Sequence, residues 1–458
     1  MNTQPTKYPP GSLREFATLA LPLILVLLSG GLMELCDRLF LAHSSFTYLH
    51  GSLLSLYLIR VFQVPCTRVA LMAQVFVGHQ CGAGSYNKVG PYIWQMIWFS
   101  LLSTIIVVPF GLLASPIFFK GSSIEEVGSF YFCTLLGFNF LFPLSASLSA
   151  FYIGRGRPKM VVISTVAAHM VNITLDALLI LGIEGWIPPL GITGSLLAKI
   201  AAQLVMCTIL FCYFIRNKNR TTYGTNQWML RPHLLWECLR IGVPRSFTSL
   251  ILLAAWAATS HVMMNKTEEH LLVISIGGSL ILSFYFIPEG MSQAVTTIAS
   301  YLIGAKKYVL FWKSLLSSFI GLLICAFILA IPLICFPGHV LNFFGANIQK
   351  NVMLHTVVRW TWLFFVFQGA SCLILGILFA LQDTLFLMWS ACFMWITSFL
   401  PIYLGIEKWN WSPDKLWLTM ACEGLLLGTI YLIRMNYILK GARLPKPLAT
   451  HPSSDLGN

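Results

Sequence analysis

Residues 14–41 read REFATLALPLILVLLSGGLMELCDRLFL, an apolar run that carries most of its charges near its two ends. A helix needs about 20 mainly apolar residues to cross the hydrocarbon core of a bilayer. This run is long enough, and so are the others of its kind along the chain. We predict twelve spans, at residues 14–41, 52–79, 91–118, 128–153, 159–183, 191–215, 235–262, 271–303, 309–335, 352–381, 384–406 and 414–438.

The composition supports a membrane-embedded helical protein. Hydrophobic residues make up 57% of the 458 positions, charged residues make up 10%, and the mean hydropathy is +0.77. A soluble domain carries about a quarter charged residues. A transmembrane barrel would show short alternating segments, so the long apolar runs favour helices. Pro22, Pro65, Pro244 and Pro288 lie inside predicted spans and are candidates for helix kinks.

The net charge of +13 does not indicate nucleic-acid binding, because the basic residues form short clusters between apolar runs. The side of the membrane with more Lys and Arg in its loops is cytoplasmic as a rule. The basic residues on the richer side are Lys7, Arg14, Lys88, Arg155, Arg157, Lys159, Arg216, Lys218, Arg220, Arg231, Lys306, Lys307, Arg434, Lys440, Arg443 and Lys446. Those on the other side are Lys120, Lys266, Lys350, Lys408 and Lys415. We therefore expect both termini in the cytoplasm.

The chain contains an internal repeat. A shift of 222 residues aligns three residues of the first span with the seventh, and three residues after the second span with those after the eighth. The aligned pairs are Leu13 with Leu235, Glu15 with Glu237, Pro22 with Pro244, Gly82 with Gly304, Ala83 with Ala305 and Tyr86 with Tyr308. Each half has six spans, so both halves enter the membrane from the same side. We predict two parallel six-helix lobes, residues 1–219 and 220–458, about an axis along the membrane normal.

Short motifs distributed along the chain point to one transporter family. They are Leu19–Pro22 (LALP), Met33–Asp37 (MELCD), Gly78–Gly84 (GHQCGAG), Gly154–Pro158 (GRGRP), Asn172–Asp176 (NITLD), Gly191–Gly194 (GITG), Ile241–Pro244 (IGVP), Pro288–Ala294 (PEGMSQA) and Gly304–Ala305. In their order, spacing and twelve-span frame, they resemble the multidrug and toxic compound extrusion (MATE) transporters. The resemblance implies export of amphiphilic, often cationic, organic compounds, coupled to sodium or protons, between two six-helix lobes.

Several ionisable residues are predicted to lie within the membrane, where a charge costs roughly 2.5–3.5 kcal/mol on insertion scales. At about 1.5 Å of rise per residue, Asp37, Asn172, Asp176 and Lys199 fall in one layer of the outer half of the first lobe. The resemblance implies that Asp37, Asn172 and Asp176 form a cation-coupling site. Lys199 departs from the family pattern and favours protons over sodium. Alternatively, Asp37 is hydrated at the outer surface and Asn172 only bonds between helices.

Other polar residues are candidates for the space between the lobes. The 222-residue shift places Arg68 opposite Gly290, so Arg68 and Glu289 are expected near pseudo-symmetric positions, as a bridge between lobes, as substrate contacts, or buried with local partners. Glu34 either lines the cleft or reaches the surface. Gln368 aligns with an acid that some family branches carry. Asp37 aligns with Thr259, so we expect the coupling chemistry in the first half.

The expected protein is therefore an antiporter of small amphiphilic or cationic molecules that works by alternating access in the plasma (bacterial inner) membrane. We expect a monomer, no enzymatic activity and no nucleic-acid partner. The 12 cysteines are scattered and show no metal-ligand spacing, so neither a metal nor a cofactor is expected. The alternative is a lipid-linked or polysaccharide flippase of the same superfamily, which would need a basic cleft; Arg60 and Arg68 are its candidate residues.

Overall fold

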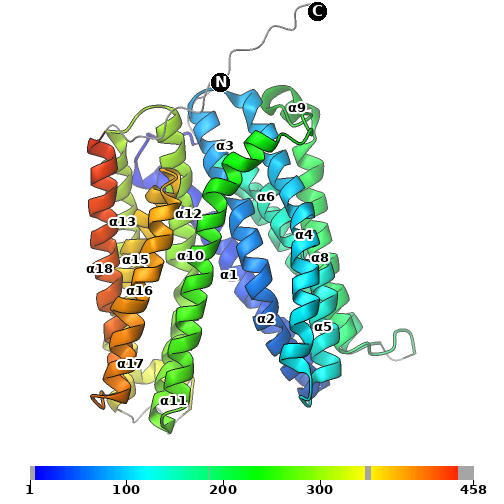
Figure 1. Ribbon diagram of the computed structural model, residues 1–458, viewed down its shortest axis with the longest axis vertical. Helices are drawn as coiled ribbons and strands as arrows, with labels where there is room; N and C mark the ends of the chain where they lie inside the picture. Colours follow the sequence, from blue (N-terminus) through cyan, green and yellow to red (C-terminus); the bar gives the residue numbers. More distant parts are fainter. Residues whose placement is uncertain (1–5, 184, 346–351, 442–458) are drawn as a thin grey trace, which may run out of the picture.

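The computed structural model describes residues 6–183, 185–345 and 352–441. Its named elements are all helical, apart from one isolated bridge between Ile183 and Ile187. Two lobes lie side by side and are joined near one end (Figure 1). Lys350, Arg443 and Lys446, which entered the charge comparison, lie outside the described residues.

The first lobe contains six spans, two of which consist of two helices each. Its elements are α1 (Leu13–Ser44), α2 (Phe46–Leu71), α3 (Ala73–Gly82), η1 (Tyr86–Lys88), α4 (Val89–Phe119), α5 (Glu125–Gly137), α6 (Leu141–Gly154), α7 (Lys159–Ile180) and α8 (Ile192–Phe214). A short helix, α9 (Asn217–Tyr223), follows at the joined end of the molecule (Figure 1).

The second lobe repeats this order. Its elements are α10 (Pro232–Met264), α11 (Glu268–Phe284), α12 (Phe286–Gly304), α13 (Leu310–Ala330), η2 (Ile331–Cys335), α14 (Pro337–Asn342), α15 (Val352–Ala380), α16 (Thr384–Met394), η4 (Trp395–Phe399), α17 (Leu400–Glu407) and α18 (Lys415–Lys440). Both α1 and α10 begin at the joined end, as a parallel repeat requires (Figure 1).

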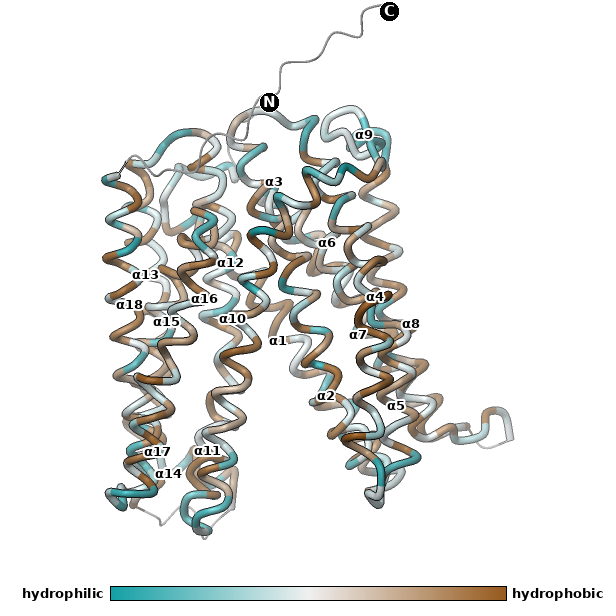
Figure 2. The backbone as a smooth tube through the Cα atoms, in the orientation of Figure 1, coloured by the Kyte–Doolittle hydropathy of each residue, from teal (hydrophilic) through white to brown (hydrophobic). Residues whose placement is uncertain are grey.

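The twelve predicted spans are confirmed within the described residues. Ten helices are long and apolar enough to cross a membrane, and the number rises to 12 when each of two bent pairs counts as one span. Large apolar side chains such as Leu282, which is 80% exposed, cover the outside of the bundle. A soluble protein would bury such side chains, whereas lipid accommodates them. Hydrophobic residues follow the long helices, and hydrophilic residues gather toward their ends (Figure 2).

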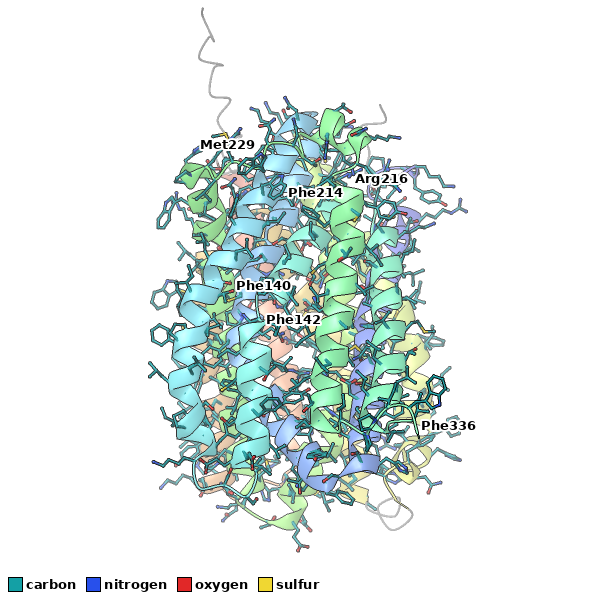
Figure 3. The ribbon with its side chains drawn as sticks, turned by 90° about the vertical axis from the view of Figure 1, so that its right-hand side faces the viewer. Phe140, Phe142, Phe214, Arg216, Met229 and Phe336 are labelled. Carbon is teal, nitrogen blue, oxygen red and sulfur yellow. The ribbon has the colours of Figure 1, made fainter. Side chains whose placement is uncertain are left out.

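Prolines explain where the bent pairs break. Proline removes the hydrogen bond to the residue four positions earlier and clashes with that residue's carbonyl. Four residues before Pro288 is Phe284, the last residue of α11, and α12 leaves at an angle of 41°. Four residues before Pro143 is Asn139, which lies in the 42° break between α5 and α6. Phe140 and Phe142 lie at this break, at mid-height of the first lobe (Figure 3).

The other predicted kink sites did not break their helices. Pro22, Pro65 and Pro244 lie inside α1, α2 and α10, which are assigned as continuous helices. In the second lobe, Pro332 and Pro401 lie in or directly after the wider turns η2 and η4. A wider turn is one way for a helix to absorb the hydrogen bond that a proline removes.

The two lobes meet through equivalent residues. A Cβ on Gly82 would lie 2.1 Å from the carbonyl oxygen of Tyr301, and a Cβ on Gly304 would lie 2.0 Å from that of His79. Gly78 packs in the same way against Ser300. Each contact relates positions that differ by about the 222-residue shift, so the C-terminal ends of α3 and α12 cross at the pseudo-two-fold axis. Beyond this crossing, α1 packs against α12 and α10 packs against α2.

The connection between the lobes is held against α4. The indole nitrogens of Trp94 and Trp98 donate to the carbonyls of Thr225 and Trp228, each at 2.8 Å. The Gln95 side chain donates to the Met229 carbonyl at 3.1 Å and accepts from the Arg231 amide at 2.8 Å. The predicted division after residue 219 falls within α9 and stays a prediction, as does the side of the membrane on which the termini lie.

The glycine contact is testable. Gly304→Ala is expected to lower the unfolding temperature in detergent, because overfilling a packed site typically costs about 1–3 kcal/mol. Gly31→Ala is the matched control, since nothing lies within 4 Å of a Cβ at that position of α1. It should be neutral or stabilising by up to about 1 kcal/mol. Equal unfolding temperatures for the two variants would show that the lobe contact is looser than described.

Candidate functional site

The first lobe brings together the four residues predicted for cation coupling. Asp37 lies on α1, Asn172 and Asp176 lie one turn apart on α7, and Lys199 lies on α8. Asp37, Asn172 and Asp176 are buried. Lys199 Nζ forms an ion pair with Asp37 Oδ2, and the two side chains are only 10% and 3% exposed. Asp37 is therefore not a hydrated surface group of this structure.

The packing of α7 against α8 positions Lys199. The α7–α8 connection turns back sharply at Gly191, whose φ is 53°, and the Leu190 amide donates to the Leu179 carbonyl at 2.8 Å. A Cβ on Gly194 would lie 2.7 Å from the Leu179 carbonyl. This close approach brings the next turn of α8, which carries Lys199, against the face of α7 that carries Asp176.

The cluster has more buried polar atoms than partners. Asp37 Oδ1, both oxygens of Asp176 and both polar atoms of Asn172 find no hydrogen-bond partner among the described residues. The Asp176 carboxylate lies beside the Asp37 carboxylate. An ionised carboxylate only accepts hydrogen bonds, so neither group can donate one to the other unless one of them is protonated. A buried carboxylate without a donor is costly. The arrangement therefore suits a proton or a small cation held by oxygen atoms.

Tyr131 on α5 adds a residue that the sequence analysis did not select. Its side chain is fully buried beside Lys199 and Ser195, and its hydroxyl finds no hydrogen-bond partner among the described residues. Tyr131 reaches Lys199 because α5 packs against α8, and sequence spacing alone does not show which helices pack together. Within the described residues, no group of three or more His, Cys, Asp or Glu side chains could hold a metal ion.

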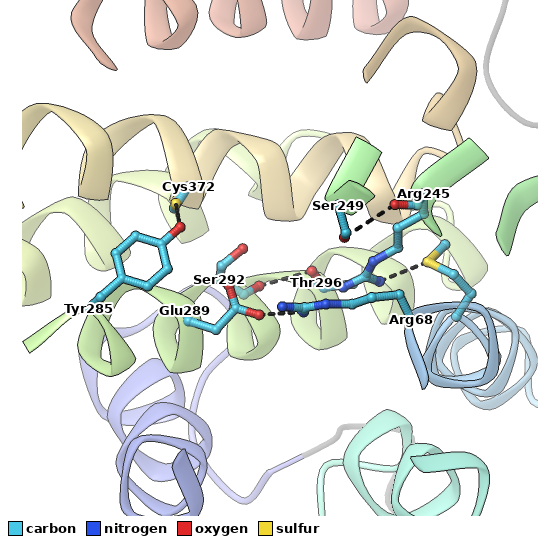
Figure 4. Close-up of polar contacts among 9 residues, drawn as sticks. Arg68, Arg245, Ser249, Tyr285, Glu289, Ser292, Thr296 and Cys372 are labelled. Carbon is cyan, nitrogen blue, oxygen red and sulfur yellow. Dashed lines mark hydrogen bonds and ion pairs between the residues drawn. The ribbon is translucent and has the colours of Figure 1, made fainter. Parts of the chain in front are cut away.

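Arg68 and Glu289 form a bridge between the lobes. Arg68 Nη1 on α2 lies 2.6 Å from Glu289 Oε1 on α12 (Figure 4). Of the alternatives for this pair, the contact across the lobe interface is the one that the structure contains. Glu34 instead pairs within its own lobe, with Arg60 at 2.5 Å and Arg38 at 3.7 Å, in a partly exposed cluster.

A buried arginine beside this bridge was missed by the sequence analysis. Arg245 on α10 is 4% exposed. Its Nη1 donates to Met72 Sδ at 2.8 Å, and its guanidinium carbon lies 4.0 Å from the centre of the Phe379 ring. The signal was present, because Arg245 directly follows Pro244 inside the seventh span.

The second lobe holds its own buried acid. Glu423 on α18 is buried beside Ser398 on η4. Gln368 on α15 lies next to it in space, with its backbone amide 2.9 Å from where a Cβ of Gly424 would be. A shift of 224 residues, close to that of the repeat, aligns Lys199 with Glu423. The two lobes thus place opposite charges at related positions.

Known proteins share this fold and sequence. A family model described as MatE matches residues 244–404. The chain is 26% identical over 457 residues to a "Probable multidrug resistance protein NorM" of Pseudomonas putida, covering 94% of this chain and 96% of that protein. It is 25% identical over 320 residues to a protein of the same name from Thermotoga maritima, covering 68% of each.

Solved structures agree on the fold. One, an outward-facing conformation of a multidrug resistance MATE family transporter of the MOP superfamily, has a TM-score of 0.84 at 15% identity and covers 95% of this chain and 97% of its own. A MOP superfamily transporter from Pyrococcus furiosus has a TM-score of 0.83 at 16% identity and covers 94% of this chain and 97% of its own; its binding pocket is described as having reverse polarity.

The two-lobed helical fold, with charged groups buried in it, is shared with solved membrane transporters that are described as members of the MOP superfamily. The family match, the relatives along nearly the whole chain and the fold all point to the MATE family of transporters. The resemblance noted in the sequence is confirmed.

The ion pair of the first lobe predicts a specific stability pattern. Lys199→Met leaves the Asp37 carboxylate buried without its counter-ion, a loss of typically about 3–5 kcal/mol. The double variant Asp37→Asn, Lys199→Met removes both charges and is expected to unfold at a higher temperature than Lys199→Met alone. Lys266→Met, which removes an exposed pair with Glu407, is the control and should cost no more than about 1 kcal/mol. Strictly additive losses in the double-mutant cycle would contradict this description.

Proposed function

We propose that this MATE-family protein is an antiporter that exports amphiphilic organic compounds in exchange for an inward-moving cation, and that the cation is a proton rather than sodium. The observation that carries the proposal is the buried group of Asp37, Asp176 and Lys199. Multidrug resistance in the names of the relatives supports the class of substrate.

The cluster suits proton coupling because it contains one charge too many. Lys199 neutralises Asp37, so an ionised Asp176 would leave a net negative charge in the first lobe. A proton that arrives from outside and is shared by the two carboxylates removes this charge. It also leaves Lys199 with one anionic partner fewer, so α8 is held less firmly to α1 and α7. The lobe then changes its packing at lower electrostatic cost.

Sodium fits the cluster less well. Sodium prefers oxygen ligands, and the free oxygens of Asp37, Asn172 and Asp176 would supply them. The Lys199 ammonium, however, already binds one of these carboxylates and would repel a second cation a few ångströms away. A proton needs only one oxygen and is not excluded in this way.

Alternating access follows from the parallel repeat. The lobes touch through equivalent residues at one end and diverge toward the other (Figure 1). The basic residues of the joined end put that end in the cytoplasm by the positive-inside rule, so the described conformation would open outward. Separation of the lobes at the joined end, with closure at the opposite end, would give the inward-facing state.

A flippase of lipid-linked saccharides is the second candidate, and the pairing of its key residues weighs against it. Such a protein needs several unpaired basic side chains between its lobes. Arg60 pairs with Glu34, and Arg68 pairs with Glu289. The two arginines that kept this alternative open are thus neutralised.

Transport by purified protein in lipid vesicles tests the proposal. A proton gradient should drive movement of a fluorescent amphiphile, tested with the cation ethidium and with the anion 1-anilinonaphthalene-8-sulfonate, and a sodium gradient at equal pH should not. Asp37→Asn and Asp176→Asn should each lower the gradient-driven rate at least about tenfold, since the carried proton loses its site. Asp414→Asn, at a partly exposed residue outside the cluster, is the matched control. Full gradient-driven transport by the double aspartate variant would place the coupling residue elsewhere.

Lys199 has a separate and more specific consequence. Lys199→Thr removes the ammonium and adds a hydroxyl oxygen beside the carboxylates. We expect the variant to gain transport driven by a sodium gradient, or to shift the pH dependence of transport to higher pH, because carboxylates without an adjacent cation hold a proton more tightly. The measurement is the rate of dye transport against external pH with and without sodium. A profile identical to that of the unmodified protein would exclude Lys199 from coupling.

A further inference from the structure

The lobe interface holds more positive than negative charge. Arg68 and Arg245 lie there with one carboxylate, that of Glu289 (Figure 4). Glu289 is hydrogen-bonded to Arg68. Among the described residues, the charged groups that act on Arg245 are Arg68, which repels it, and Glu289. The group therefore carries one positive charge without a partner.

The contacts of Arg245 do not replace a counter-ion. A thioether sulfur is a weak acceptor, and an aromatic face attracts a cation by about 0.5–2 kcal/mol. Arg245 has Met72 and Phe379 in these roles. Its five N–H groups match a planar anion such as a carboxylate or sulfonate far better. An uncompensated guanidinium inside a membrane protein is expensive, and such a residue marks a functional site by default.

The position of the group is that of a substrate site. Arg68 lies 14 residues before Gly82, and Glu289 lies 15 residues before Gly304. At about 1.5 Å of rise per residue, both lie roughly 20 Å from the closed end, toward the middle of the membrane. The helices are interrupted beside them, at Met72 and at Tyr285. Transporters built from repeats bind substrate near the midplane, between the repeats, at broken helices.

The group is also within reach of a ligand. The side chains of Arg68 and Glu289 are 31% and 21% exposed. Ile24, which is partly exposed, supplies apolar surface next to this pair, and Arg245 lies behind it against the buried Met72 and Phe379.

We infer that this interface binds the anionic group of amphiphilic substrates, such as a carboxylate or sulfonate on an aromatic or aliphatic body. Arg245 supplies the unpaired charge. Arg68 exchanges Glu289 for the bound anion, and Glu289 competes with it. Arg68 and Glu289 belong to different lobes. An anion that binds Arg68 in place of Glu289 therefore also weakens the ion pair that joins the two lobes. The inference rests on the proposed function for the export of such compounds, but binding itself needs no ion gradient.

Two dyes with one ring system test the inference. Protein in lipid nanodiscs is titrated with 1-anilinonaphthalene-8-sulfonate and, separately, with its uncharged counterpart N-phenyl-1-naphthylamine. Arg245→Gln should weaken sulfonate-dye binding about tenfold, a factor that corresponds to about 1.4 kcal/mol. Binding of the uncharged dye should change less than about twofold. Arg245→Lys keeps the charge and should retain most of the affinity. Arg434→Gln, which breaks a pair with Asp383 away from the interface, is the control and should leave both dyes unaffected.

The sign of a third variant decides between a binding site and a structural pair. Glu289→Gln removes the competing carboxylate, so it should tighten sulfonate-dye binding several-fold. If it weakens that binding, or if Arg245→Gln binds the sulfonate dye as well as the unmodified protein, the inference is wrong. Should Arg245→Gln fail to fold, Arg68→Gln alone replaces it: the change leaves Glu289 to neutralise Arg245 and should weaken sulfonate-dye binding as well. Proton-driven export without any saturable sulfonate-dye binding would remove this inference alone. Sulfonate-dye binding without export would remove the proposed function alone.

Discussion

The close approach of α3 and α12 at Gly82 and Gly304 is the contact on which the arrangement of the lobes depends. Each glycine lies against a backbone carbonyl of the other half, where any side chain would separate the helices. The two contacts are related by the repeat, so neither half can move there without changing both. This crossing closes one end of the molecule. It leaves the other end of each lobe free to diverge, and it determines which side chains of α2, α10 and α12 face one another further along.

The fold was predictable because its main signal is length. A bilayer requires apolar runs of a certain size, so the twelve spans could be read without knowing how they pack. The depth of a residue in the membrane was predictable for the same reason. The rise of a helix alone placed Asp37 and Lys199 in one layer. The repeat placed Arg68 near Glu289 because it relates equivalent positions of the two halves.

The features that the sequence did not predict depend on packing between helices. Arg245 and Tyr131 lie at these sites only because of how α10 packs against α2 and how α5 packs against α8. The prolines show the same limit. Pro288 breaks its span, whereas Pro22, Pro65 and Pro244 lie within continuous helices. Whether a proline breaks a helix depends on which neighbours satisfy the carbonyl that it leaves free, and one chain's sequence does not specify those neighbours.

Within the first-lobe cluster and the lobe interface, two charged groups of opposite sign lack a charged partner. Asp37 pairs with Lys199 and Arg68 with Glu289, which leaves Asp176 in the first lobe and Arg245 at the interface. In the two proposals above, a proton neutralises Asp176 and an anion neutralises Arg245. If the proton moves inward as the anion moves outward, both movements carry positive charge in the same direction. The membrane potential, negative inside, then adds to the proton gradient, at about 2.3 kcal/mol per elementary charge for each 100 mV. An exchange of a proton for a cation would lack this contribution, so the two unpaired residues together favour acidic over basic substrates.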